Sequence, residues 1–273
     1  MNRHIDEIEF TIFDTETTGL EPQLGDRIVE IAGLRFKGSQ TIGTFQTLIN
    51  PRRPISAAAF QVNKITPQML QDAPDTRTAI PEFLKFIQGS CLCSYNAAFD
   101  IEFLNNELKL INQSPLNDIM AVDVLKMAKR LLPDLERYAL WFVAHKLGLS
   151  AQQKHRAFSD VELTFDVFNK LKGMLQAKGV FDFMDFVGLF GINSVSSSDL
   201  NNQRIAKIQE AIELGARLKI RYLSGSQAEV TEREVVPKEI KKEKNRVYLV
   251  GHCCLRNQER SFRIDGILHL EIV

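Results

Sequence analysis

The sequence lacks the long apolar segments that membrane and secreted proteins carry. None of its uninterrupted apolar runs approaches the ~20 residues that a helix needs to cross a bilayer. Residues 1–7 are mostly polar and do not provide the apolar core of a signal peptide. We therefore expect a cytoplasmic protein that makes no contact with a membrane.

Cysteine is also scarce. The four cysteines occur as two close pairs, Cys91 with Cys93 and Cys253 with Cys254, and neither pair has C-x-x-C spacing. Such near neighbours are poor frameworks for zinc or for disulfides. We expect reduced, mostly buried thiols and no redox role.

The chain has no excess charge of either sign. Its 34 basic residues balance 34 acidic ones, which argues against a protein that grips a long duplex through a dominant basic field. The two parts differ, because residues 204–273 hold 14 basic and 10 acidic residues, whereas residues 1–203 hold 20 and 24. A mildly acidic N-terminal part therefore precedes a mildly basic C-terminal part.

Strand-like and helix-like patterns alternate over residues 1–175, which favours an α/β fold over a helical bundle or a β-sandwich. The strand-like segments are residues 8–16, 28–36, 44–49, 91–94 and 119–122, and the helix-like segments are residues 81–88, 100–110, 138–147 and 160–171. The last helix carries an apolar stripe of Val161, Phe165, Phe168 and Leu171. We predict that residues 1–175 form a first domain.

Residues 176–203 break this alternation. The segment is dense in phenylalanine, and we expect this cluster to pack a domain junction, the alternative being a peptide that docks a partner. Its members are Phe181, Phe183, Phe186 and Phe190. The serine-rich residues 193–199 follow, with a composition typical of a linker.

A second, smaller unit is predicted at residues 204–273. It begins with a helix that carries Ile205, Ile208 and Ile212 on one face. Strand-like runs follow at residues 218–223, 229–236, 246–254 and 261–273. This pattern is typical of a small β-rich domain.

Two carboxylates end the first predicted strand. Side chains alternate along a strand, so the apolar face that includes Ile12 continues into Asp14 and Glu16. In open α/β sheets, ligands bind in the crevice at the carboxyl ends of the strands. Two like charges held together cost free energy unless a cation lies between them, and Mg²⁺ and Mn²⁺ take oxygen ligands of this kind. Taken alone, the pair is equally consistent with an acidic strand end that meets only water.

Further polar residues begin two of the predicted helices. Asp100 lies in the first turn of one, where an acid is also favoured by the helix N-terminus itself. Asp160 begins another and follows His155 by five residues. Five residues on a regular helix place two side chains about 140° apart, so both reach one site only if His155 lies on the preceding loop.

Together these residues resemble the DEDDh exonuclease family, to which the proofreading subunit of the bacterial replicative DNA polymerase belongs. That family has an Asp-x-Glu on its first strand, an Asp in an Asn-x-x-Phe-Asp context, and a His-x-x-x-x-Asp near the end of the domain. All three motifs occur here in order within residues 8–171. The triple match is far more specific than any one motif.

The resemblance implies a ribonuclease H-like exonuclease fold, a mixed sheet flanked by helices, and it assigns roles to five residues. Two divalent cations, Mg²⁺ or Mn²⁺, would be bound by Asp14, Glu16, Asp100 and Asp160, and His155 would be the general base. Two cations about 3.5–4 Å apart can activate a water and stabilise the leaving 3′-oxygen. A histidine that binds no metal, with an ordinary pKa of about 6.5, can accept the proton of that water at neutral pH.

The same resemblance places the terminal nucleotide beside the motifs. The expected contacts are Thr17, Thr18, Gly19, Leu20, Asn96 and Phe99. Of these, Leu20 and Phe99 could offer apolar surface to the base. One departure is Tyr95, which replaces a histidine of many members and does not titrate near neutrality. Asp123 matches a further acidic position of the family, and we expect it to cap a helix.

Residues 204–273 resemble a WYL domain, a small Sm-like or SH3-like β-barrel module, on the strength of short segments around Tyr222, Tyr248 and the closing residues 260–265. This resemblance implies binding of a ligand or of nucleic acid through a polar, basic groove. The candidate residues are Tyr222, His252, Arg256, Arg260 and Arg263. Arginine suits phosphate because its planar group donates two parallel hydrogen bonds. The alternative is that these cations only solvate a small barrel.

The leading hypothesis is a metal-dependent 3′→5′ exonuclease that releases nucleoside 5′-monophosphates from single-stranded DNA or RNA 3′ ends. A DNA polymerase or a regulatory ligand is a further candidate partner. The alternative is a non-catalytic regulator that uses the nuclease fold as a binding platform, although such a protein gains little from keeping mutually repelling acids. A third hypothesis restricts the enzyme to very short RNA or small phosphodiesters.

Overall fold

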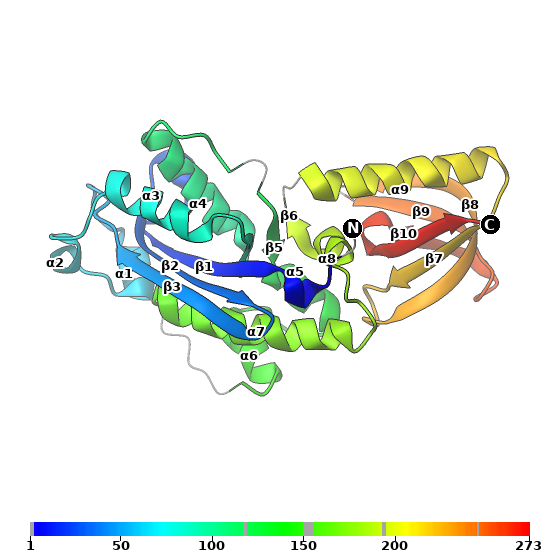
Figure 1. Cartoon of the computed structure of the whole chain (residues 1–273), viewed down its shortest axis with the longest axis horizontal. Helices are drawn as coiled ribbons and strands as arrows, with labels where there is room; N and C mark the ends of the chain where they lie inside the picture. The colour runs from blue at the N-terminus through cyan, green and yellow to red at the C-terminus, as the bar shows by residue number, and fades with distance from the viewer. Residues whose placement is uncertain (1–2, 117–118, 150–154, 193–194, 245) are drawn as a thin grey trace.

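The computed structural model describes residues 3–116, 119–149, 155–192, 195–244 and 246–273, and for residues 195–199 the backbone only (Figure 1). Across these residues, every helix is too short or too polar to cross a bilayer. Of the four cysteines, Cys91, Cys93 and Cys253 are buried and Cys254 is exposed, and all four thiols are free, as predicted.

The N-terminal domain is built on a mixed sheet in the order β3-β2-β1-β4-β5-β6. Its strands are β1 (Glu9–Thr17), β2 (Ile28–Lys37), β3 (Gln40–Leu48), β4 (Cys91–Ser94), β5 (Ala121–Asp123) and β6 (Gly191–Ile192). The first three strands form an antiparallel meander, and β4 and β5 run parallel to β1. This arrangement confirms the predicted α/β class.

Helices cover both faces of this sheet (Figure 1). They are α1 (Ala57–Asn63), α2 (Pro67–Leu70), α3 (Thr76–Ile87), α4 (Ala97–Leu110), α5 (Val124–Leu131), α6 (Leu140–Lys146), α7 (Ala157–Gln176) and α8 (Phe183–Phe190). Because side chains alternate along β1, Phe10 packs into the core that contains α7, whereas Phe13 packs into the core that contains α3 and α4. Strands β1, β2, β4 and β5 are therefore largely buried on both faces, whereas the edge strand β3 is exposed or half-buried along its length.

The C-terminal domain consists of α9 (Val195–Glu213) and a five-stranded antiparallel sheet in the order β10-β9-β8-β7-β11. The strands are β7 (Leu218–Leu223), β8 (Val230–Glu243), β9 (Arg246–Cys253), β10 (Gln258–Arg263) and β11 (Ile267–Ile272). The long strand β8 pairs with β7 over its first half and with β9 over its second, with an irregularity between Pro237 and Glu239. The predicted small β-rich domain is thus confirmed.

Several predicted boundaries differ from the structure. The strand-like run predicted at residues 261–273 forms two strands, the end of β10 and β11, separated by a 3-10 helix at Ile264–Gly266. Residues 195–199 begin α9 and do not form a linker; residues 193–194 of that prediction lie outside the described part. The apolar face of Ile208 and Ala211 packs on the sheet, and this packing outweighs the weak helix preference of serine. Helix α3 begins at Thr76, because Asp75 caps it, and includes Pro81. Helix α7 is longer than predicted at both ends.

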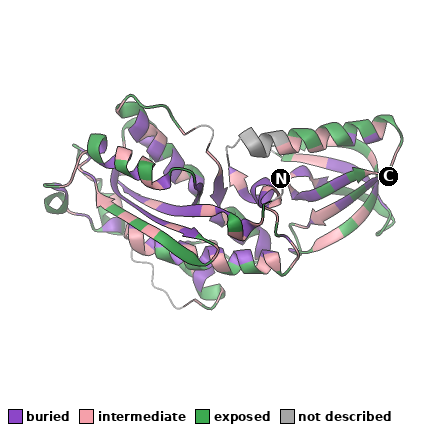
Figure 2. Ribbon diagram, in the orientation of Figure 1, coloured by how far each residue is buried: buried purple, intermediate pink, exposed green. Residues whose placement is uncertain are grey.

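The phenylalanine cluster packs the junction between the two domains, as predicted. Phe183, Phe186 and Phe190 on α8 are buried against the N-terminal core, whereas Phe181 is 45% exposed. Leu223 and Leu268 of the second domain belong to the same buried cluster. Figure 2 shows this burial continuing from the first sheet into α8.

The sheet of the first domain is completed by residues that follow α8. Strand β6 pairs antiparallel with β5, through Ile192 with Ala121 and Gly191 with Val122. On this basis we propose that the first domain extends to Ile192, beyond the boundary at residue 175 that the sequence suggested.

Candidate active site

Three carboxylates converge at the end of β1. Asp14 and Glu16 project from the same side of that strand, and Asp160 lies in the first turn of α7, which packs on β1. Oxygen atoms of the three groups lie within 4.8 Å of one another. The period of two along β1 produces this pairing, as the sequence predicted.

Asp100 approaches the same place from α4. One of its carboxylate oxygens accepts hydrogen bonds from the backbone N–H of Thr15 at 3.0 Å and from the hydroxyl of Thr15 at 2.7 Å. The other oxygen accepts a short hydrogen bond from the hydroxyl of Ser94. Asp100 is only 2% exposed, so these three donors hold its side chain between β1 and β4.

Burial and mutual repulsion shift the acids toward their protonated forms. Burial, followed by the charge of Asp100, raises the pKa of Asp14 well above its ordinary value. Burial, followed by the charge of Asp160, raises the pKa of Glu16 to about 8. Burial also raises the pKa of Asp100 to about 6, although the hydrogen bonds from Ser94 and Thr15 oppose this shift.

These donors fit hard divalent cations. All are carboxylate oxygens, the ligand type that Mg²⁺ and Mn²⁺ prefer, and the charges of neighbouring acids add to the effect of burial in raising the pKa values of Asp14 and Glu16. A cation between them would remove the repulsion that the shifts reflect. The arrangement therefore suits metal-assisted chemistry.

His155 lies immediately before α7. Its side chain is exposed and its backbone is left-handed, with φ 49°, whereas the helix begins at Ala157. The five-residue spacing allows both side chains to reach one site only if His155 precedes the helix. The structure meets this condition, because His155 is on the loop and Asp160 is on the helix. Residues 150–154, which precede it, lie outside the described part of the chain.

Glu30 is a site neighbour that the sequence reasoning missed. It lies on β2 directly opposite Glu16, and it is fully buried. Its carboxylate forms a two-pronged ion pair with Arg156, the residue after His155. A lone acid inside the apolar run of residues 28–34 was the available signal.

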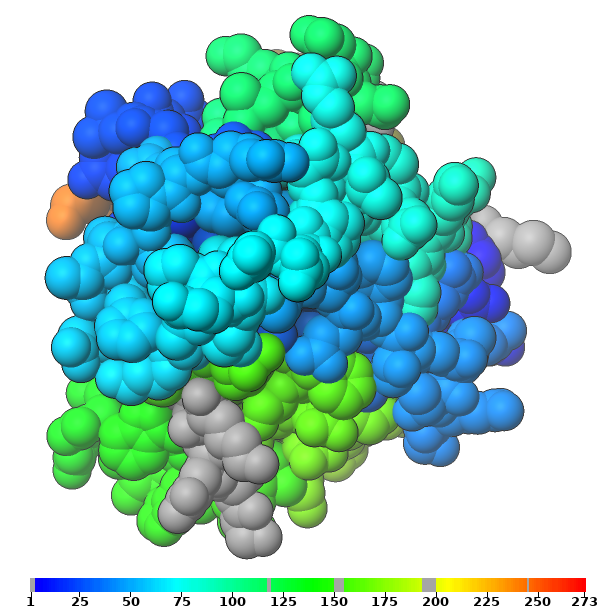
Figure 3. All heavy atoms as spheres, turned by 90° about the vertical axis from the view of Figure 1, so that its left-hand side faces the viewer, coloured from blue at the N-terminus to red at the C-terminus, as the bar shows by residue number. Residues whose placement is uncertain are grey.

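A cavity of about 640 Å³ opens beside Glu16. Four of the predicted nucleotide contacts line it, namely Thr17, Gly19, Leu20 and Phe99. Leu24, Ala58, Ala59 and Val62 add apolar walls, and Arg53, Asp26 and Asn63 add polar ones. Figure 3 faces the end of the molecule where α1 and α2 meet the loop containing the short 3-10 helix Pro22–Leu24.

Thr18 differs from the prediction. Its side chain is 1% exposed, donates to the carboxylate of Asp26 at 2.8 Å and accepts from the backbone N–H of Arg27 at 3.1 Å. The hydroxyl therefore braces the loop that forms the cavity and does not face the cavity. The sequence showed only that Thr18 follows the strand.

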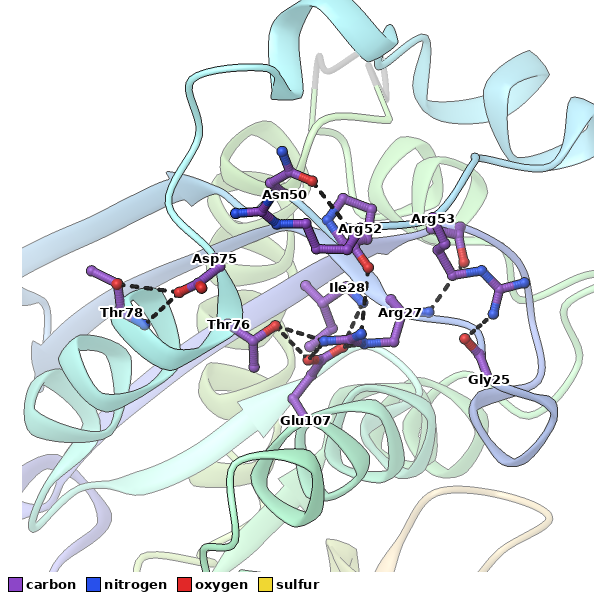
Figure 4. A network of polar contacts seen from close by, with 12 residues as sticks. Gly25, Arg27, Ile28, Asn50, Arg52, Arg53, Asp75, Thr76, Thr78 and Glu107 are labelled. Carbon is purple, nitrogen blue, oxygen red and sulfur yellow. Dashed lines mark hydrogen bonds and ion pairs between the residues drawn. The ribbon is translucent and has the colours of Figure 1, made fainter.

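An ion pair between the half-buried Arg27 and the buried Glu107 anchors the same loop (Figure 4). Arg27 donates to both carboxylate oxygens of Glu107, at 2.8 and 2.7 Å, and Glu107 also accepts from the backbone N–H of Ile28 and the hydroxyl of Thr76. Arg53 binds the carbonyl of Gly25 on the other side of the loop. These contacts fix one wall of the cavity to α3 and α4.

The residues before α4 are held by Asp123. Its carboxylate accepts hydrogen bonds from the backbone N–H groups of Leu125, at 2.9 Å, and Asn96, at 3.1 Å, so it caps α5, as predicted. Asn96 is exposed and left-handed at the start of α4. Tyr95 donates from its hydroxyl to the carbonyl of Tyr138 at 2.6 Å, which is a structural contact.

The five candidate residues of the second domain fall into two places. Tyr222 and Arg263 lie together, because the Tyr222 hydroxyl accepts from the Arg263 backbone N–H at 3.3 Å. Asp265 and the buried Arg130 of α5 join them. His252, Arg256 and Arg260 are instead exposed on the hairpin of β9 and β10. The five residues that were predicted to line one groove therefore lie in two separate places.

The mixed sheet and its acid cluster define the first domain as a nuclease domain with the ribonuclease H-like fold. Two solved structures share this fold, a full-length 3′-exonuclease and cell-death related nuclease 4. The first has TM-score 0.54 and 16% identity over 65% of this chain and 62% of its own. The second has TM-score 0.54 and 12% identity over 62% and 65%.

Sequence profiles agree with this class. The Exonuclease (RNase_T) profile matches residues 11–168, which include all five motif residues, and the WYL domain profile matches residues 203–272. The chain belongs to the Exonuclease family and carries a WYL domain at its C-terminal end.

Curated relatives resemble the first domain. DNA polymerase III subunit epsilon of Treponema pallidum is 39% identical over 166 residues, or 60% of this chain and 76% of that protein. DNA polymerase III PolC-type of Caldanaerobacter subterraneus is 34% identical over 172 residues, or 63% of this chain. The matched segment spans only 12% of that polymerase.

Proposed function

We propose that the protein is a metal-dependent 3′→5′ exonuclease that releases nucleoside 5′-monophosphates from single-stranded 3′ ends. The observation that supports this most directly is the convergence of Asp14, Glu16 and Asp160 within 4.8 Å, with Asp100 held alongside. The cavity beside Glu16 has room for a terminal nucleotide and offers apolar walls to its base.

Asp14, Glu16, Asp100 and Asp160 would hold two divalent cations, Mg²⁺ or Mn²⁺. When bound, the cations supply charge stabilisation for the phosphodiester and make a water more acidic. Without them, burial, followed by the charge of Asp160, raises the pKa of Glu16 to about 8, so this carboxyl is largely protonated near neutrality.

The remaining steps fall to other side chains. His155, exposed at the start of α7, accepts the proton of the attacking water. Leu20, which is 77% exposed, and Phe99 hold the terminal base, while the backbone around Gly19 approaches the sugar. These contacts orient the final phosphodiester toward the acid cluster.

The relatives support the choice of substrate. Their names identify them as DNA polymerase III subunits or PolC-type polymerases, which favours a nucleic-acid 3′ end as substrate and a DNA polymerase as partner. The second domain is proposed to bind nucleic acid or a regulatory ligand through His252, Arg256 and Arg260, which are exposed on one hairpin.

Degradation of oligonucleotides by the full chain tests this function. Single-stranded DNA and RNA, labelled at the 5′ end, should shorten to a ladder in the presence of Mg²⁺ or Mn²⁺, and 3′-labelled strands should release labelled mononucleotide first. Asp14→Asn should lose at least ~1,000-fold in kcat. Metal-independent binding without any product would instead favour the non-catalytic regulator.

A further inference from the structure

Glu30 is a fully buried acid that the mechanism above does not use. It occupies β2 opposite Glu16, on the side of the sheet that α7 covers. A buried carboxylate is costly unless each of its oxygens is paired. Its partners therefore indicate what the residue holds in place.

Four donors surround the Glu30 carboxylate. One oxygen accepts from the amide of Gln46 at 2.9 Å and from Nη2 of Arg156 at 2.7 Å. The other accepts from Nε of Arg156 at 3.0 Å and from the backbone N–H of Ala157 at 3.2 Å. Both oxygens are thus fully used, and two of the four bonds come from one rigid guanidinium.

The partners of Glu30 mark the point where the loop becomes α7. Ala157 is the first residue of that helix, and its N–H is one of the groups that no helical carbonyl can satisfy. Arg156 precedes it and has no capping hydrogen bond from its own side chain. Glu30 on β2 therefore caps the N-terminus of α7, a role that the residues next to the helix do not fill.

We propose that Glu30 is a positioning residue, because by binding Arg156 and the N–H of Ala157 together it fixes the start of α7 relative to β1. The proposal rests on the proposed function. The start of α7 carries His155 on one side and Asp160 one turn later, so Glu30 acts through these two residues and touches no substrate. The ion pair with Arg156 also balances the negative charge of Glu30, which lies beside a cluster of mutually repelling acids.

Three variants test this role in the full chain: Glu30→Gln, Arg156→Gln and the double variant. Each should lower kcat by about 10–100-fold with little change in KM, the loss typical when a residue that orients a metal ligand is removed. The double variant leaves no buried charge unpaired, so it should fold better than either single variant and yet recover no turnover. The loss of kcat in the double variant should not exceed the loss in the less active of the two single variants, because both changes break the same contact.

Glu9→Gln is the matched control. Glu9 on β1 and Arg35 on β2 also form an ion pair, in which Nε and Nη2 of Arg35 donate to one carboxylate oxygen of Glu9 at 3.0 and 2.6 Å, and this pair lies away from the acid cluster. This variant should keep wild-type kcat. Thermal unfolding and near-ultraviolet circular dichroism on every variant distinguish a loss of the fold from a displacement of the start of α7 in a folded protein.

Two measurements do not depend on turnover. In Glu30→Gln, hydrogen exchange of the Ala157 amide should accelerate, and the affinity for Mn²⁺ measured calorimetrically should fall by about 10-fold. Wild-type kcat in the folded double variant overturns the proposal, as does unchanged Ala157 exchange. If the wild-type chain degrades no nucleic acid, the proposed function fails, and amide exchange and Mn²⁺ affinity still decide the role of Glu30.

Discussion

Asp100 accepts two hydrogen bonds from Thr15, one from its backbone N–H at 3.0 Å and one from its hydroxyl at 2.7 Å. Thr15 stands between Asp14 and Glu16 on β1, so the strand that supplies two acids also holds a third. The alternation of side chains makes this possible, because Thr15 faces α4 while its neighbours face α7. The two halves of the cluster are therefore tied through one residue.

Thr15→Val should lower kcat/KM by about 10-fold or more, because a hydrogen bond to a charged group contributes about 1.5–3 kcal/mol. The measurement is a comparison of initial rates on a single-stranded oligonucleotide. Thr11→Val is the matched control, since the Thr11 hydroxyl bonds that of Ser90 at 2.7 Å on the same buried side of β1. Equal activity losses in the two variants would contradict the assigned role of Thr15.

The metal-free protein should become less stable as the pH rises. Burial raises the pKa of Glu16 from 4.5 to about 8, so its proton binds the folded chain more tightly than the unfolded one. Its contribution to stability is therefore complete below pH 4.5 and is lost as the pH rises to about 8. Urea unfolding in chelator, at pH 5 and at pH 8, measures the effect.

Glu16→Gln provides the reference for that experiment, because its side chain does not titrate. The free energy of unfolding of the wild type should fall relative to this variant between pH 5 and pH 8. Adding Mg²⁺ at pH 8 should reverse the fall in the wild type, since a ligand that binds only the folded state stabilises it. A constant difference between the two proteins across this range would refute the expectation.

Phe99→Ala should weaken substrate binding and leave chemistry largely intact. Phe99 lines the cavity and packs against Phe103, with ring centroids 4.8 Å apart. Stacking of a base on an aromatic side chain contributes about 1–3 kcal/mol, so KM should rise by about 10-fold or more. Leu110→Ala, at the far end of the same helix and 47% exposed, should leave KM unchanged.

Arg130→Met should loosen the contact between the domains. Arg130 on α5 is 7% exposed, pairs with Asp265 at 3.5 Å and donates to the carbonyl of Leu223 at 3.3 Å. Because Asp265 keeps its pair with Arg263, the loss of stability should be about 1–3 kcal/mol, less than for a fully orphaned charge. Lys129→Ala, its exposed neighbour, should unfold at the wild-type midpoint.

The sequence predicted the parts of the site that depend on short-range periodicity. Alternation on one strand pairs Asp14 with Glu16, and the first turns of two helices present Asp100 and Asp160. Asp123 likewise caps α5, because capping is a local property. The family resemblance linked these separate signals into a single cluster.

The features that the sequence could not show depend on contacts between residues that lie far apart along the chain or on opposite sides of a loop. Glu30 and Arg156 are separated by 126 positions, so neither residue marks the other along the chain. Thr18 seemed to face a ligand, but its partner is Asp26 on the opposite side of the loop. The serine-rich residues looked like a linker because their composition does not reveal the packing of Ile208 and Ala211 further along the same helix.

Strand β6 has a consequence for how the protein is made. Its residues Gly191 and Ile192 complete the nuclease sheet, yet they are synthesised after α8 and immediately before the second domain. A growing chain that has just finished α7 carries all of the acids, but the edge of β5 is still unpaired and Phe10 and Phe168 lack their α8 neighbour Phe186. The nuclease sheet can therefore be completed during translation only after the ribosome has reached the border of the next domain.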